Sequence, residues 1–169
     1  MKTIEPLTDQ RRERLVQQVS AGTYGTVLIL AALSVIEADE VGSGAGWELV
    51  TGVGIATYIA HAYAEVMGDH VRHRSSLDRK EIARAMTDGT PVVFAALVPA
   101  LALGLGRLDA ISSTAALWVA VAVAVLQLVG VGLFVGWAVT PRRPHWWAYG
   151  VAAAAMGVVV VVLKLSLSH

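Results

Sequence analysis

Long stretches without a charged side chain are the feature that most restricts how this chain can fold. No Asp, Glu, Lys or Arg occurs between Asp109 and Arg142, and the runs 15–36, 89–106 and 144–163 are equally free of them. A helix of about 20 apolar residues crosses the ~30 Å hydrocarbon core of a bilayer. Only 15% of the residues are charged, against about 25% in soluble domains. The pattern predicts an all-α, multi-pass membrane protein in contact with the lipid bilayer.

Charged connectors, glycines and prolines divide the chain into expected segments. Residues 1–14 are polar, and we expect them to lie at the cytoplasmic interface. Residues 15–167 are expected to form one five-helix membrane domain. The expected spans are about 15–36, 48–70, 91–106, 112–139 and 146–167.

Two glycine pairs predict close contacts between helices. Gly22 and Gly25 lie in the first expected span, and Gly132 and Gly136 lie in the fourth. The second pair marks a packing face either within one protomer or between two.

The positions of lysine and arginine predict the orientation, because cytoplasmic loops carry an excess of these residues. Eleven of them lie in the N-terminal segment and the second and fourth connectors, whereas only Arg107 and Lys164 lie on the opposite side. We therefore expect the N-terminus in the cytoplasm and, with five spans, the C-terminus outside. The abundance of Ala, Val, Gly and Arg suggests a bacterial gene, which makes the plasma (inner) membrane the expected location.

The basic connector over residues 72–84 has the pattern of a short amphipathic helix. Ser75 or Ser76 could cap it, and the turn residues 88–91 would end it. Its basic residues make it a candidate docking site for a protein partner or an anionic lipid. The whole chain has a net charge of zero and no cysteine, so we expect no nucleic-acid partner, disulfide or thiolate metal site.

A polar stripe inside the second expected span is the strongest functional signal. His61, Glu65 and Asp69 follow at intervals of four residues, which places them within an arc of roughly 80° on one helix face. Ionisable groups inside a bilayer cost on the order of 2.5–3.5 kcal/mol each and usually line a pathway or pair with one another. Imidazole and carboxylate ligands suit divalent transition metals, and the same groups can relay protons.

Structural explanations of the stripe remain open beside the functional ones. His61 and Glu65 could form a buried pair that only fixes helix packing. Asp69 and Arg72 have the i, i+3 spacing of an ion pair at a helix end, which needs no function. Three uncharged polar residues could act as outer hydrogen-bond partners of the stripe: Tyr24, Tyr58 and Gln127.

The sequence shows no constellation typical of an enzyme. We find no nucleophile and base placed together, so we expect no catalytic residues and no enzymatic activity. A haem domain would need a second buried histidine on another helix, and none is present in the expected spans. No tightly bound cofactor is therefore expected.

The segment 67–75 resembles the second-helix signature of the vacuolar iron transporter (VIT) family. That signature ends in Gly-Glu-Tyr-Val-Ser followed by Arg/Lys-Ser. The matching positions here are Gly68, Val71, Arg74 and Ser75. Asp69 replaces the glutamate and His70 replaces the tyrosine. The five-span layout, the basic connector and the proline that opens the third span are also similar to the family.

The chain departs from the family pattern at two positions along the metal route. The first-helix Asp-Gly pair of the family is replaced by Tyr24-Gly25, and the methionine before the signature is replaced by Glu65. The resemblance implies a homodimeric exporter of Fe²⁺ or Mn²⁺, with proton coupling as an option. Loss of the first-helix acid favours the alternative hypothesis, a non-transporting membrane scaffold or partner subunit on the same fold.

Overall fold

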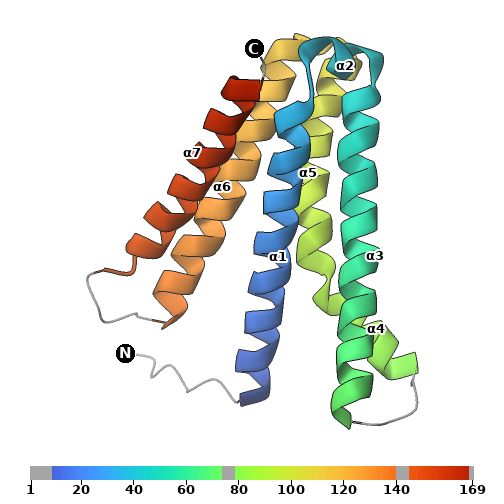
Figure 1. The fold of residues 1–169 in the computed structure, drawn as a ribbon, viewed down its shortest axis with the longest axis vertical. Coiled ribbons are helices and arrows are strands. Elements are labelled where there is room, and N and C mark those ends of the chain that lie inside the picture. Colours follow the sequence, from blue (N-terminus) through green and yellow to red (C-terminus); the bar gives the residue numbers. More distant parts are fainter. Residues whose placement is uncertain (1–8, 74–78, 140–144, 168–169) are drawn as a thin grey trace.

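The computed structural model describes residues 9–73, 79–139 and 145–167, and the regular elements in this part are all α-helices (Figure 1). The expected all-α fold is confirmed. In chain order the helices are α1 (Asp9–Val35), α2 (Ala38–Ser43), α3 (Ala45–His73), α4 (Arg79–Asp88), α5 (Thr90–Arg107), α6 (Ser113–Val139) and α7 (Ala148–Leu167).

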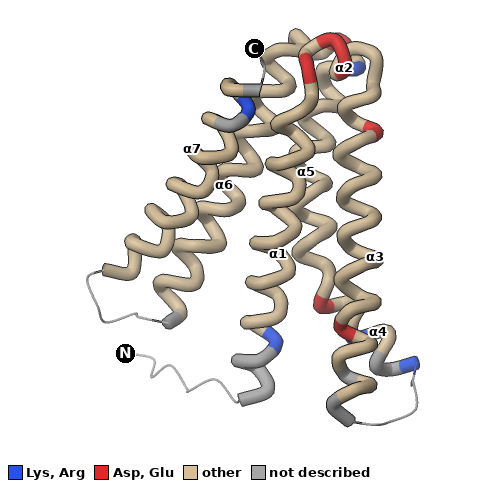
Figure 2. Tube along the Cα trace, viewed as in Figure 1, with Lys and Arg blue, Asp and Glu red and all other residues tan. Residues whose placement is uncertain are grey.

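Five of the helices are long, and each covers one of the five expected spans to within a few residues. Their charged positions lie toward the helix ends, as the coloured trace shows (Figure 2). Three segments are long and apolar enough to cross a membrane: Arg14–Val35, Thr90–Arg107 and Ser113–Ala138. The apolar part of α7 is shorter, Ala148–Val162, and the described residues of α3 form no such segment.

Helix α2 occupies a stretch that reads in the sequence as an acidic, glycine-rich loop. The backbone N–H of Glu37 donates to a carboxylate oxygen of Glu40 (2.9 Å), which stabilises the first turn. The helix ends at Gly44, which has a left-handed φ of 89°. This left-handed φ favours glycine, whereas the nearest atoms to an added Cβ belong to the flexible end of Arg107 and can move aside. This turn joins α1 to α3 at one end of the bundle, named here the α2 end.

Helix α4 confirms a helix in the basic connector. It ends where the sequence predicts, at Gly89, whose N–H donates to the carbonyl of Ala85 (3.1 Å). Ser75 and Ser76, the expected caps, lie outside the described residues, as does most of the N-terminal segment 1–14.

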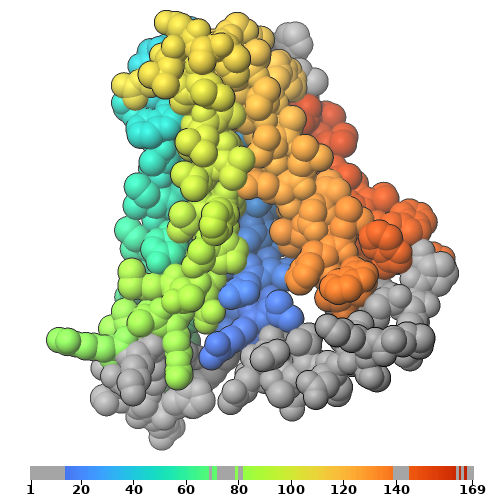
Figure 3. Space-filling model, turned by 180° about the vertical axis from the view of Figure 1, so that it is seen from behind, coloured from blue at the N-terminus to red at the C-terminus, as the bar shows by residue number. Residues whose placement is uncertain are grey.

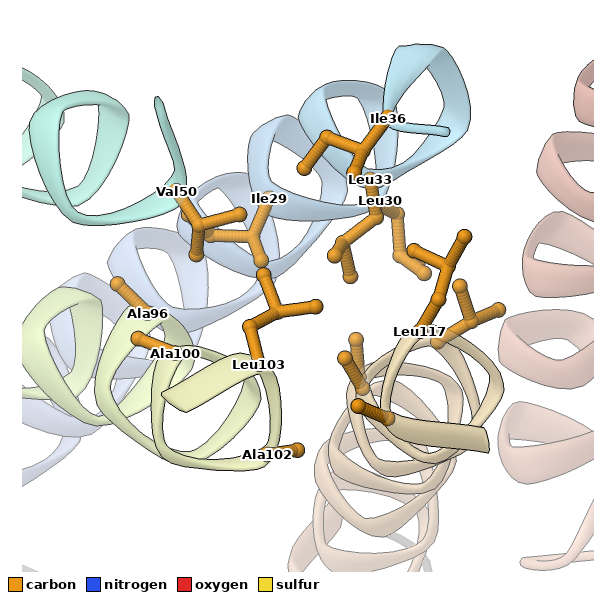
Figure 4. Close-up of a cluster of buried hydrophobic side chains, with 14 of the residues drawn as sticks. Ile29, Leu30, Leu33, Ile36, Val50, Ala96, Ala100, Ala102, Leu103 and Leu117 are labelled. Carbon is orange, nitrogen blue, oxygen red and sulfur yellow. The ribbon is translucent and has the colours of Figure 1, made fainter. Parts of the chain in front are cut away.

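The apolar core lies near the α2 end, where α1, α3, α5 and α6 converge (Figure 4). Leu33 of α1 and Leu103 of α5 are fully buried. Helix α6 meets them with a ridge of small residues at intervals of four, which lets the backbones approach closely. The ridge consists of Ala116, Ala120 and Ala124, and each is 0% exposed.

The two glycine pairs both make close contacts inside the protomer. A Cβ on Gly25 would lie 3.3 Å from Val92 of α5, so α1 and α5 pack tightly there. A Cβ on Gly132 would lie 2.6 Å from the Tyr149 carbonyl oxygen of α7. The packing face at Gly132 and Gly136 is therefore occupied by α7 of the same chain.

Candidate functional site

His61 and Glu65 lie one turn apart on α3 and form a close pair. The His61 Nε2 is 3.7 Å from a Glu65 carboxylate oxygen, within ion-pair range but too long for a hydrogen bond. Their side chains are only 23% and 10% exposed. The four-residue spacing therefore places an imidazole and a carboxylate together in a half-buried position.

The pair continues the inward face of α3. Val50, Gly54 and Thr57 are buried on this helix, and at 100° per residue His61 and Glu65 fall on the same side. The opposite side carries exposed apolar residues: Ile55, Ile59 and Tyr63. Helix α3 packs against α1, α4 and α5, so the pair is directed toward the bundle.

Asp69 lies one turn beyond Glu65 in the same helix, but its side chain lies outside the described part of the structure. Within that part, no group of three or more His, Asp or Glu residues could hold a metal ion. The described geometry thus provides two ligand groups on one helix face.

Tyr58 ties α3 to the connector helix. Its hydroxyl donates to the main-chain carbonyl of Met86 (3.0 Å). Its ring lies against Gly89, where an added Cβ would come within 3.0 Å of it. The structure therefore places Tyr58 as an anchor between α3 and the end of α4.

Tyr24 and Gln127 are the other expected outer partners of the pair. Tyr24 is 59% exposed on α1. The Gln127 amide nitrogen donates to the Phe94 carbonyl of α5 (3.0 Å), and Gln127 lines a crevice to which α3 contributes no residue. The structure joins His61 with Glu65 and places Gln127 on a crevice that does not include them.

A buried lysine at the α2 end is a polar feature that the sequence analysis missed. The Lys164 Nζ on α7 donates to the carbonyls of Leu33 (2.7 Å), Ser34 (3.3 Å) and Ile36 (2.8 Å). These carbonyls belong to the end of α1, where helical partners run out and a positive charge is favourable. A lone lysine inside an apolar run was the available signal, but its partners lie about 130 residues earlier in the chain.

The fold and the pair define a helical bundle with three candidate membrane spans and one half-buried His–Glu pair. In comparisons with known proteins, no family model, curated protein or solved structure matches this chain.

Proposed function

We propose that the chain is a five-span membrane transporter of a divalent metal ion such as Fe²⁺ or Mn²⁺, similar to the VIT family. The observation that carries the proposal is the His61–Glu65 pair, half-buried on the inward face of α3. In this proposal α1, α3, α5, α6 and α7 all cross the membrane, with the N-terminus in the cytoplasm. Contact with the bilayer follows from the candidate membrane helices.

The proposed route follows the polar stripe of α3. His61, Glu65 and Asp69 recur at one-turn intervals, with a rise of about 6 Å from one to the next. The imidazole and carboxylates can exchange a divalent ion along this face. Proton coupling is compatible with the same groups, because binding a metal requires a neutral imidazole and an ionised carboxylate.

Homodimer formation is part of the proposal. Helix α3 presents a row of exposed small residues that lets a second helix approach closely. The row consists of Gly52, Ala56, Ala60 and Ala64. The row lies about 100° around α3 from the polar stripe, so in such a dimer each stripe would face its own bundle.

The proposal is tested by Fe²⁺ or Mn²⁺ flux in proteoliposomes, with Glu65→Gln as the main variant. We expect its flux to fall by about tenfold or more, because even an indirect metal partner is worth about 10–100-fold in affinity. Glu48→Gln is the matched control, since Glu48 is an exposed acid on the same helix. Equal flux in wild type and Glu65→Gln would remove the pair from the route.

The exposed side of α4 favours a second candidate, the non-transporting scaffold or partner subunit. Ile82 and Met86 are 41% and 49% exposed there, beside the exposed Arg79 and Arg84. Such a surface suits a protein partner or an anionic lipid. Wild-type protein without metal flux, whose binding to anionic vesicles is lost in Arg79→Gln/Arg84→Gln, would select this candidate.

A further inference from the structure

A crevice of about 630 Å³ opens between α1, α5 and α6, away from the His61–Glu65 pair. It lies in the half of the bundle remote from α2, and the hollow between α1 and α6 is visible in the space-filling view (Figure 3). Its volume is within the range of small-molecule sites, about 300–1,000 Å³. No described residue of α3 or α4 lines it.

The crevice exists because α6 and α1 are held by different neighbours at this end. Close contacts at Gly132 and Gly136 hold α6 against α7, whereas Gly22 and Gly25 hold α1 against α5. Toward α2 the space between α1 and α6 is filled by the buried core around Ala120. At the remote end it is left open, and Gly130 of α6 has no atom within 4 Å of an added Cβ.

The described lining is mostly apolar, with a few uncharged polar groups. No Asp, Glu, Lys, Arg or His is among the described lining residues. Phe94 and Phe134 provide aromatic surface, and the polar members are Gln18, Thr26, Thr90 and Gln127. A charged ligand would lose its hydration here without gaining an opposite charge.

At Thr26, Thr90 and Gln127 the hydrogen bonds leave acceptors rather than donors facing the crevice. The Thr26 hydroxyl donates to the Gly22 carbonyl (2.8 Å), and the Thr90 hydroxyl donates to the Thr87 carbonyl (2.6 Å). The Gln127 side-chain nitrogen donates to the main-chain carbonyl of Phe94. The Gln127 amide oxygen is buried and has no hydrogen-bond partner in the described structure. A buried acceptor without a partner costs about 1–3 kcal/mol, which a donor on a ligand recovers.

We propose that this crevice binds a neutral amphipathic molecule, with an apolar body against Phe94 and Phe134 and a hydroxyl or amide donor directed to Gln127. The ligand chemistry is the same whether it enters as a solute or as a hydroxyl-bearing lipid. The site stands independently of metal transport, because it shares no residue with the polar stripe.

The absence of cysteine from the sequence allows a direct test by cysteine labelling. Gly130→Cys adds its Cβ to open space at the crevice, and Ala122→Cys is the matched control on α6, because Ala122 is exposed and does not line the crevice. The rate of N-ethylmaleimide labelling is measured in the presence of one of three probes that share the same apolar body. These are the neutral 3-phenylpropanol, the anion 3-phenylpropionate and the cation 3-phenylpropylammonium. We expect the alcohol alone to slow labelling at Gly130→Cys, by about tenfold at ten times its dissociation constant.

Two outcomes of this labelling comparison would overturn the proposal. Equal protection of both cysteines would show general partitioning into the apolar phase, and protection by either charged probe as strong as that by the alcohol would exclude a neutral site. In the Gly130→Cys background, Gln127→Met should remove the advantage of the alcohol over propylbenzene. A retained advantage would contradict the role of the Gln127 oxygen.

A second labelling experiment distinguishes a ligand that enters from water from one that enters from the bilayer. Labelling of Gly130→Cys is measured in phosphatidylcholine vesicles with and without dioctanoylglycerol. Protection by this lipid supports entry from the bilayer, and protection by 3-phenylpropanol alone supports entry from water. Protection of Gly130→Cys by neither compound overturns the proposal.

Discussion

The two ends of the bundle are built differently. At the α2 end, Leu33 and Leu103 are fully buried and Lys164 satisfies the last carbonyls of α1. At the opposite end the helices separate, and both the His61–Glu65 pair and the crevice lie there. The comparison indicates that the α2 end provides most of the apolar packing, while the opposite end holds the His61–Glu65 pair and the crevice.

Leu103→Ala, at the α2 end, should cause the largest loss of stability. Leu103 is 0% exposed, and a buried Leu→Ala change costs about 2–5 kcal/mol because a cavity remains. Leu101→Ala is the control on the same helix, since Leu101 is 59% exposed. Thermal unfolding in one detergent should show a large decrease in Tm only for Leu103→Ala. Similar Tm values in both variants would contradict the assignment of the core.

Lys164→Met should cause the second largest loss of stability. The substitution keeps an apolar stem but leaves the carbonyls of Leu33 and Ile36 without their donor, at about 1–3 kcal/mol for a buried acceptor. Ser166→Ala, on the exposed side of α7, is the control. We expect a lower Tm and faster amide exchange near Ile36 only in Lys164→Met. Unchanged exchange there would show that the lysine does not hold the end of α1.

Two glycines of α6, two residues apart, allow the packed and the open side of this helix to be compared. Gly132→Ala should destabilise by about 1–3 kcal/mol, because overpacking forces α6 and α7 apart. Gly130→Ala adds a methyl group in open space and should stabilise by about 0.5–1 kcal/mol through helix propensity. Opposite shifts of Tm are expected, and shifts of the same sign would contradict the separation of α6 from α1.

Tyr58→Phe should cause the smallest loss of stability, confined to the end of the bundle opposite α2. It removes the hydrogen bond to the Met86 carbonyl, worth about 0.5–1.5 kcal/mol. Hydrogen exchange should rise over α4 while the exchange of α6 stays unchanged. A uniform rise in both helices would show that Tyr58 supports the whole bundle.

Local patterns were sufficient to predict the long helices. Runs without charge predicted four of the five, and the span expected from Pro91 begins within one residue of α5, which starts at Thr90. The interval of four residues also placed His61 and Glu65 on one face, since helical periodicity is a local property. Helix α2 was missed because its first turn depends on a Glu37–Glu40 contact inside a loop-like composition.

Contacts between distant segments could not be read from periodicity. Gln127 reaches Phe94, and Lys164 reaches Leu33, only after the helices have packed. The sequence shows that such residues are costly in an apolar environment, but it does not show which carbonyl receives them. The crevice could not be predicted for the same reason. It forms because α6 packs on α7 at Gly132 and Gly136 but on α1 only near Ala120.

The Lys164 contact also has a consequence for the order of folding. Synthesis proceeds from the N-terminus, so the end of α1 is made long before α7, the last of the described helices. Until α7 docks, the carbonyls of Leu33 and Ile36 lack the donor that the finished structure gives them. Closure of the α2 end is therefore completed only after α7 has been synthesised and has docked against α1.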